Sequence, residues 1–118
     1  MKDINKVQIM GRIGHDPELL EVQSGQKRTR FGVATSRKVK HGEDVTDETT
    51  WHRVCVWGNL ADLCHQYLRK GSPVYIEGRL RSYQFTGKDG QDRAGMEIQA
   101  EEVIFLESKA DTERRNRA

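Results

Sequence analysis

Five stretches of the chain alternate apolar and polar residues with a period of two. They are residues 5–13, 29–36, 50–57, 73–85 and 94–106. Such alternation is typical of strands that bury one face. Between the third and fourth stretches, apolar residues instead recur at helical spacing: Leu60, Leu63, Cys64, Tyr67 and Leu68. The order of the patterns therefore predicts three strands, one helix with Asn59 as its N-cap, and two more strands.

Gly11, Gly32 and Gly78 lie in the interior of three of the predicted strands. A glycine inside a strand often marks a sharp bend or the close approach of another backbone. Curved strands in this number, with one α-helix between strands 3 and 4, fit an all-β, five-stranded Greek-key barrel, the OB-fold. A two-layer α+β sheet is the structural alternative.

The segments between and after the strands carry weaker signals. Residues 18–23 can continue extended after the break at 14–17, and residues 86–92 have the glycines of a hairpin tip. Residues 37–49 contain no periodic apolar set, so we expect a long exposed loop there. No periodic pattern continues after residue 107, which predicts a single domain over 1–107 and a disordered C-terminal segment over 108–118.

Composition limits the class of protein. Charged residues make up 32% of the 118 residues, and the mean hydropathy is −0.82. Residues 109–118 hold four basic and two acidic residues, which leaves 16 of each sign in the rest of the chain. Total charge therefore does not by itself predict a nucleic-acid-binding protein. The chain has neither an apolar stretch of the about 20 residues that a membrane span needs nor a secretory signal pattern, so we expect a cytoplasmic protein.

The cysteines and histidines lack the spacing of a metal site or of a catalytic pair. Cys64 lies on the apolar stripe of the predicted helix, where cysteine behaves as a small hydrophobic residue. Cys55 and His52 are three residues apart on a strand and face opposite sides, so they cannot form a nucleophile–base pair. The chain also lacks a phosphate-binding loop and a nucleophile elbow. We therefore expect no metal, no cofactor and no enzymatic activity.

The strand over residues 50–57 reads TWHRVCVW and contains both tryptophans of the chain. Alternation places four of its side chains on one face: Trp51, Arg53, Cys55 and Trp57. The valines on the other face, Val54 and Val56, suit a core. A core position for the tryptophans requires burial of the Arg53 charge, which is costly without a partner. From the pattern alone, a nucleic-acid-binding face, an oligomer interface and a core face all stay open.

Binding of single-stranded nucleic acid combines aromatic rings, on which bases stack, with cations that follow the phosphates. The aromatic candidates are Trp51, Trp57, Tyr83 and Phe85. The candidate cations are Lys38, Lys40, Arg53, Lys70, Arg79 and Arg81.

These residues lie within motifs that resemble the bacterial single-stranded DNA-binding proteins. The matching stretches, in the family's order, are NKVQIMGRIGHDPEL, FGVATS, TWHRVCVWGNLAD, YLRKGSPVYIEGRLRS and GQDR. The resemblance spans nearly the whole chain up to about residue 107. It implies an OB-fold protein of the nucleoid that binds and protects single-stranded DNA, without sequence readout, in replication, recombination and repair.

The resemblance also implies roles for single residues. The family's stacking positions fall on Trp51, Trp57 and Phe85, and two of its DNA-contacting cations fall on Arg53 and Lys70. The family is usually a homotetramer, a dimer of dimers. Its subunit contacts fall on the first strand, which includes Lys6 and Gln8, and on His52, Tyr75 and Glu77.

Two departures from the family pattern matter for function. Val39 stands near the position of a family tryptophan, so one stacking platform is missing. The chain ends in ERRNRA, which is basic, whereas family members end in an acidic tip that recruits replication and repair proteins. We expect such partners only if an acidic tail continues beyond Ala118. These departures keep an alternative open, a dimeric accessory OB-fold protein of replication restart that acts mainly by docking another protein.

Overall fold

The computed structural model describes residues 1–107, 110–111 and 113–114. Its elements, in chain order, are β1 (Val7–Ile13), β2 (Glu18–Glu21), β3 (Lys27–His41), β4 (Asp44–Trp57), α1 (Asn59–Tyr67), β5 (Pro73–Thr86) and β6 (Asp92–Phe105). Most of the segment predicted to be disordered, 108–118, lies outside the described residues.

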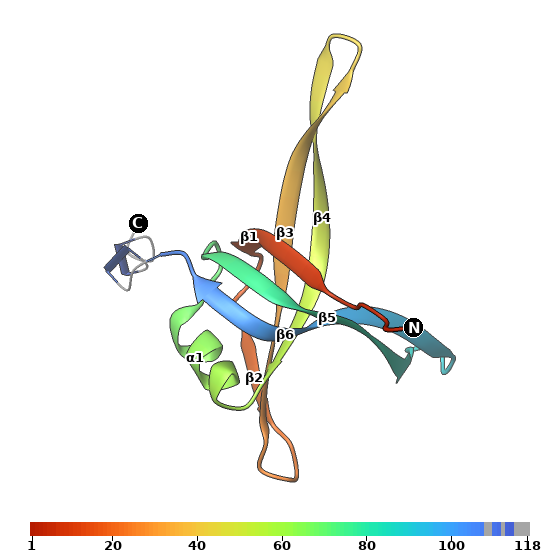
Figure 1. Cartoon of the computed structure of the whole chain (residues 1–118), viewed down its shortest axis with the longest axis vertical. Coiled ribbons are helices and arrows are strands. Elements are labelled where there is room, and N and C mark those ends of the chain that lie inside the picture. The colour runs from red at the N-terminus through yellow and green to blue at the C-terminus, as the bar shows by residue number, and fades with distance from the viewer. Residues whose placement is uncertain (108–109, 112, 115–118) are drawn as a thin grey trace.

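The strands form one sheet in the order β1-β5-β6-β4-β3-β2, and β1 also pairs with β3. That last pairing joins Arg12 to Ala34 and Ile13 to Val33, and it closes the sheet into a barrel. β4 and β6 are parallel, whereas the other pairs are antiparallel. β2 is a four-residue strand that pairs with β3 alone. The predicted five-stranded barrel is therefore confirmed, with α1 after the third barrel strand, β4 (Figure 1).

The barrel core consists mainly of the apolar residues that alternate along the strands. Its fully buried members include Val33, Val54, Val56, Val74 and Ile76. The inward side of α1 adds Ala61 and Cys64 to this cluster. The Thr29 hydroxyl on β3 donates a hydrogen bond of 2.7 Å to the Ala61 carbonyl, which ties the helix to the barrel.

The helix begins one residue earlier than the sequence predicts. Gly58 is the N-cap, and Asn59 is already helical. The chain leaves β4 at Gly58 with φ of 72°, a conformation that glycine adopts without the steric cost of a Cβ. The Gly58 amide donates to the Lys27 carbonyl at 2.9 Å, so the turn is also anchored to β3. The predicted N-cap at Asn59 is wrong because the backbone, not a capping side chain, sets this turn.

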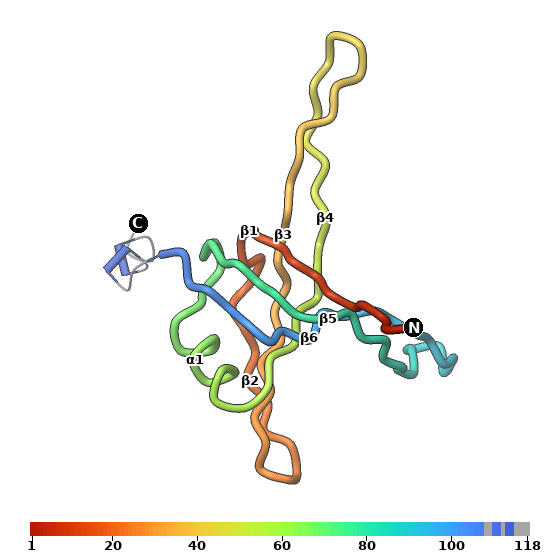
Figure 2. The backbone as a smooth tube through the Cα atoms, in the orientation of Figure 1, coloured from red at the N-terminus to blue at the C-terminus, as the bar shows by residue number. Residues whose placement is uncertain are grey.

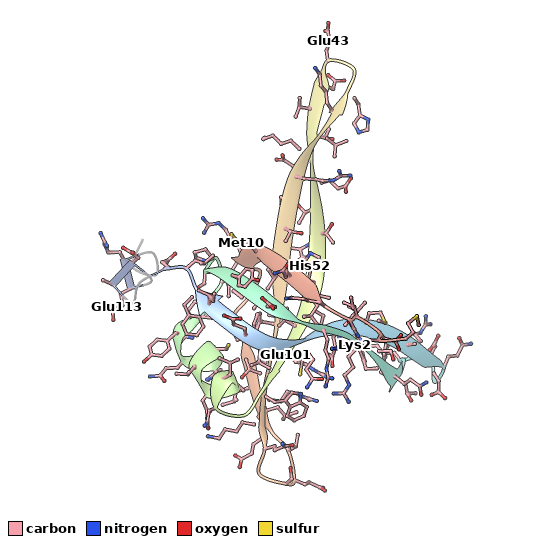
Figure 3. All side chains as sticks on the ribbon, viewed as in Figure 1. Lys2, Met10, Glu43, His52, Glu101 and Glu113 are labelled. Carbon is pink, nitrogen blue, oxygen red and sulfur yellow. The ribbon has the colours of Figure 1, made fainter. Side chains whose placement is uncertain are left out.

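The long loop predicted over residues 37–49 is instead a two-stranded arm. β3 and β4 stay paired from Arg28 opposite Trp57 out to His41 opposite Asp44. Figure 2 shows the two strands continuing well beyond the barrel, and Glu43 lies at the far end of the arm in Figure 3. Apolar alternation identifies strands that bury one face, but the outer arm is exposed on both faces and needs no such pattern.

Polar contacts replace apolar packing along the arm. Arg37 Nε lies 3.2 Å from Glu48 Oε1, and Lys38 Nζ lies 3.4 Å from Asp47 Oδ1. Opposite charges on directly paired residues favour this register. Gly42, with φ of 64°, allows the tight turn at the tip.

Both cysteines are buried, Cys55 at 1% and Cys64 at 0% exposure. Burial raises the pKa of the Cys64 thiol to about 12. Burial, and after it the nearby Glu97 carboxylate, also raises the pKa of Cys55. Strand parity placed Cys55 on the same face as the tryptophans. Cys55 does lie opposite Arg30 on that face, but it is buried there, with the charged groups of Glu97 and Arg30 nearby.

We expect both thiols to stay unreactive toward a disulfide reagent in the folded protein, because the thiolate is the nucleophile and burial raises the pKa of both thiols. Equal rates of labelling in folded and urea-unfolded protein would contradict this expectation.

The raised pKa of Cys64 also predicts that the folded protein loses stability at alkaline pH. Its protonated form contributes fully to the free energy of unfolding below about pH 9, and this contribution is lost as the pH rises toward about 12. Urea unfolding at increasing pH measures the loss, and Cys64→Ala should remove this part of it. The same loss of stability in Cys64→Ala as in the wild type would contradict this role of Cys64.

Candidate nucleic-acid interface

The Trp51 side chain on β4 is 62% exposed, although it belongs to the barrel part of the strand. Its ring lies against two backbone positions without side chains. A Cβ added to Gly14 would meet the ring at 2.2 Å, and one added to Gly32 would lie 3.7 Å from it. The ring is thus supported from below by glycine backbone and remains largely open to solvent. Such a surface can accept a stacked base.

A second aromatic group joins β4 to β5. Arg53 Nη1 donates a hydrogen bond of 2.6 Å to the Tyr83 hydroxyl, and its guanidinium lies 5.3 Å from the centre of that ring. The Tyr83 and Phe85 rings are 5.8 Å apart and inclined by 29°. A Cβ on Gly95 would lie 2.6 Å from the Tyr83 ring, so glycine also supports this group. The structure therefore brings together three of the residues that the sequence predicted for binding.

Trp57 is half-buried, and its partner is a residue that sequence reasoning missed. The Arg28 guanidinium lies 5.6 Å from the centre of the Trp57 ring, within the range of a cation–π contact. The β3–β4 register pairs Arg28 with Trp57 and Arg30 with Cys55. The alternation of Arg28 and Arg30 with Thr29 and Phe31 is visible in the sequence. The structure buries Thr29 and Phe31, so the two arginines lie on the opposite, outer face of β3.

Arg81 completes this surface from β5. In the β5–β6 register Arg81 lies opposite Glu97 on β6. Glu97 in turn lies beside Arg30, with 3.9 Å between Glu97 Oε2 and Arg30 Nη2. Together these residues form one side of the barrel, called below the aromatic–arginine face: Arg28, Arg30, Trp51, Arg53, Trp57, Arg81, Tyr83, Phe85 and Glu97. Glu97 is its single carboxylate, so the face is strongly cationic.

Two of the predicted lysines, Lys38 and Lys40, lie on the arm. Lys38 is paired with Asp47 on the arm, and Lys40 is opposite Val45 further out. Lys70 follows α1, where its backbone amide donates to Asp16 Oδ1 at 2.8 Å. Residues 37–49 of the arm contain three basic and four acidic residues, so the arm is not a cationic one.

Four of the five predicted subunit-contact residues form one hydrogen-bonded network, made by Lys6 just before β1, Gln8 on β1, and Tyr75 and Glu77 on β5. Lys6 Nζ lies 3.0 Å from Glu77 Oε1, Gln8 donates to the Tyr75 hydroxyl at 3.0 Å, and that hydroxyl donates to Glu77 Oε2 at 2.8 Å. Hydrogen bonds from Lys6 and Tyr75 lower the pKa of Glu77. The fifth residue, His52, is labelled in Figure 3, and its Nε2 atom lies 2.8 Å from the Thr35 hydroxyl oxygen.

The described residues contain no group of three or more metal-ligating side chains placed to hold an ion. Within the same residues, α1 and every other helical segment is too short or too polar to cross a membrane.

The chain belongs to the single-strand binding protein family, whose model matches residues 4–106. It is 43% identical over 112 residues to a single-stranded DNA-binding protein of Xylella fastidiosa, covering 93% of this chain and 68% of that protein. It is 39% identical over 113 residues to a mitochondrial single-stranded DNA-binding protein of Danio rerio, covering 89% of this chain and 77% of the relative.

Among solved structures, the fold is similar to that of a Plasmodium falciparum SSB in complex with single-stranded DNA. The TM-score is 0.80 at 31% sequence identity, over 91% of this chain and 98% of the other. The resemblance drawn from the sequence motifs is therefore confirmed at the level of family and fold.

Proposed function

We propose that this protein binds single-stranded DNA without sequence readout, as a non-catalytic factor of DNA replication, recombination and repair. The observation that carries the proposal is the aromatic–arginine face. Exposed or half-exposed rings of Trp51, Trp57 and Phe85 alternate there with arginines on adjacent strands. Rings of this kind accept any base, because every base has a stacking surface.

The binding mode follows from the chemistry of the face. Bases stack on the tryptophan and phenylalanine rings, at about 1–3 kcal/mol per base. Arg53 and Arg81 contact phosphates and release condensed counterions, so that affinity falls with rising salt. Glycines under Trp51 and Tyr83 hold these rings in place, which lowers the entropic cost of binding.

Fluorescence anisotropy of a labelled oligo-dT, with unlabelled duplex as competitor, tests this function. We expect saturable binding that weakens with salt and that duplex of equal length competes for poorly. Equal competition by single strand and duplex would favour a general polyanion-binding protein instead.

Gly14 gives a test of the Trp51 platform in which the tryptophan itself is not mutated. A Cβ at residue 14 would lie 2.2 Å from the ring, so Gly14→Ala should displace Trp51. We expect weaker binding of oligo-dT, approaching the loss of about 1–3 kcal/mol that removal of a stacking ring causes. The matched variant Gly32→Ala, whose Cβ lies 3.7 Å from the ring, should bind nearly as the wild type does. Identical affinities for the two variants would contradict a supported platform at Trp51.

For assembly, the proposal is a homotetramer, a dimer of dimers, in the cytoplasm. Support comes from the Lys6–Gln8–Tyr75–Glu77 network, which fixes long polar side chains across β1 and β5 and so prepares a surface for a second copy. Sedimentation equilibrium should give four times the 13.6 kDa chain mass. A monomer or a dimer at micromolar concentration would overturn the tetramer. The accessory role in replication restart is not favoured, because the relatives found are named single-stranded DNA-binding proteins.

A further inference from the structure

Two arginines of β3 have hydrogen-bonding capacity that the described structure does not use. The Nε atoms of Arg28 and Arg30 are both buried and both lack a hydrogen-bond partner. Buried donors without partners are costly, commonly about 1–3 kcal/mol each. Both Nε atoms are covered by protein, so a ligand from solvent would meet the outer guanidinium nitrogens of these two side chains.

The contacts that these arginines do make leave them available. Arg28 lies over the Trp57 ring, which offers no hydrogen-bond acceptor in its plane. Arg30 faces Glu97 at 3.9 Å, longer than a hydrogen bond, and its side chain is still 39% exposed. Glu97 is 5% exposed, and its Oε2 atom also lacks a hydrogen-bond partner. The loose ion pair therefore keeps Arg30 at the face, while its Nε atom has no hydrogen-bond partner.

A purely structural role accounts for Arg30 but not for Arg28. Arg30 could serve simply to neutralise the buried Glu97 charge. Arg28 has no such role, because none of the ion pairs in the described residues includes it. Two cations side by side on one strand face, against a single buried carboxylate, leave an excess of positive charge beside an aromatic ring.

We propose that Arg28 and Arg30 form a phosphate-binding pair that extends the single-stranded DNA path along β3, past Trp57. The inference rests on the proposed function and adds two contacts to it. A phosphodiester supplies several acceptor oxygens and a negative charge, which match the planar fork of an arginine guanidinium. A base stacked on Trp57 brings its own phosphate to the same side of the barrel, beside Arg28.

The salt dependence of oligo-dT binding tests the pair, with the charge-neutral variants Arg28→Gln and Arg30→Gln. Each lost phosphate contact reduces the slope of log K against log salt by about 0.7 for single strands. This corresponds to about fivefold weaker binding in 0.1 M salt for each variant. Arg28→Lys should retain most of the slope. Arg114→Gln removes the same charge at an exposed residue after β6 and should match the wild type.

Slopes of Arg28→Gln and Arg30→Gln equal to that of Arg114→Gln would overturn the pair while leaving the proposed function intact. Absence of oligo-dT binding by the wild type would instead defeat the proposed function itself. If the glutamine variants do not fold, the wild type still decides the question through arginine modification by phenylglyoxal, read by mass spectrometry. Saturating oligo-dT should protect Arg28 and Arg30 but not Arg114. Equal modification of all three with and without DNA would contradict the proposal.

Discussion

Replacement of Trp51 by alanine should weaken binding of oligo-dT by about 1–3 kcal/mol, which is roughly 5- to 150-fold. The ring is 62% exposed and rests on glycine backbone, so the loss should fall on binding and not on folding. Surface side chains contribute little to the free energy of unfolding, usually within about 0.5 kcal/mol. Anisotropy titration and urea unfolding of the same preparation measure the two effects.

Leu63→Ala serves as the control for Trp51→Ala, because Leu63 is also an exposed apolar residue but lies on α1. Its binding of oligo-dT should be that of the wild type. A Trp51→Ala protein that unfolds much more readily than the wild type would favour a core role for the tryptophan. Unchanged binding by a fully folded Trp51→Ala protein would remove Trp51 from the interface.

A single methyl group at residue 78 should cost far more stability than most surface changes. The β5–β6 pairing shifts register between Glu77 and Gly78, a β-bulge that bends the strand. A Cβ on Gly78 would lie 2.1 Å from the backbone oxygen of Gln99. Because backbone rather than a flexible side chain must move, we expect Gly78→Ala to lower the free energy of unfolding by about 3 kcal/mol.

The other strand glycines provide matched comparisons for Gly78→Ala. Gly11→Ala should be similarly destabilising, since its Cβ would lie 2.2 Å from the Ala34 carbonyl oxygen. Gly32→Ala should be tolerated, because the nearest atom, on His15, is 3.6 Å from its Cβ. Urea or thermal unfolding of the three variants ranks them. Equal stability of all three would contradict the argument from close backbone approach.

These glycines also show how far the sequence alone predicts the fold. Apolar alternation identifies the barrel strands because one face of each packs into the core, and helical spacing identifies α1 for the same reason. Strand glycines predicted bending in general, but only the structure separates Gly11 and Gly78, where backbones nearly touch, from Gly32, where space remains. The arm over residues 37–49 was missed because its pairing depends on cross-strand polar contacts, which leave no apolar pattern.

The candidate site was predicted in part and for a similar reason. Parity correctly placed Trp51, Arg53 and Trp57 on one face of β4, but parity does not say what covers a side chain. Cys55 is therefore buried within that face. Glu97 is buried although it is charged, which no local pattern predicts, because its partner Arg30 comes from a strand distant in the sequence. The roles of Lys38, Lys40 and Lys70 in binding remain predictions.

The intrinsic fluorescence of the protein tests the central claim most directly. Both tryptophans of the chain, Trp51 and Trp57, lie on the aromatic–arginine face, so the emission reports on that surface alone. Titration with oligo-dT should quench the emission strongly and to saturation, and added salt should reverse the quenching. Unchanged emission at an oligo-dT concentration where anisotropy shows full binding would contradict stacking on these rings, and with it the proposed interface.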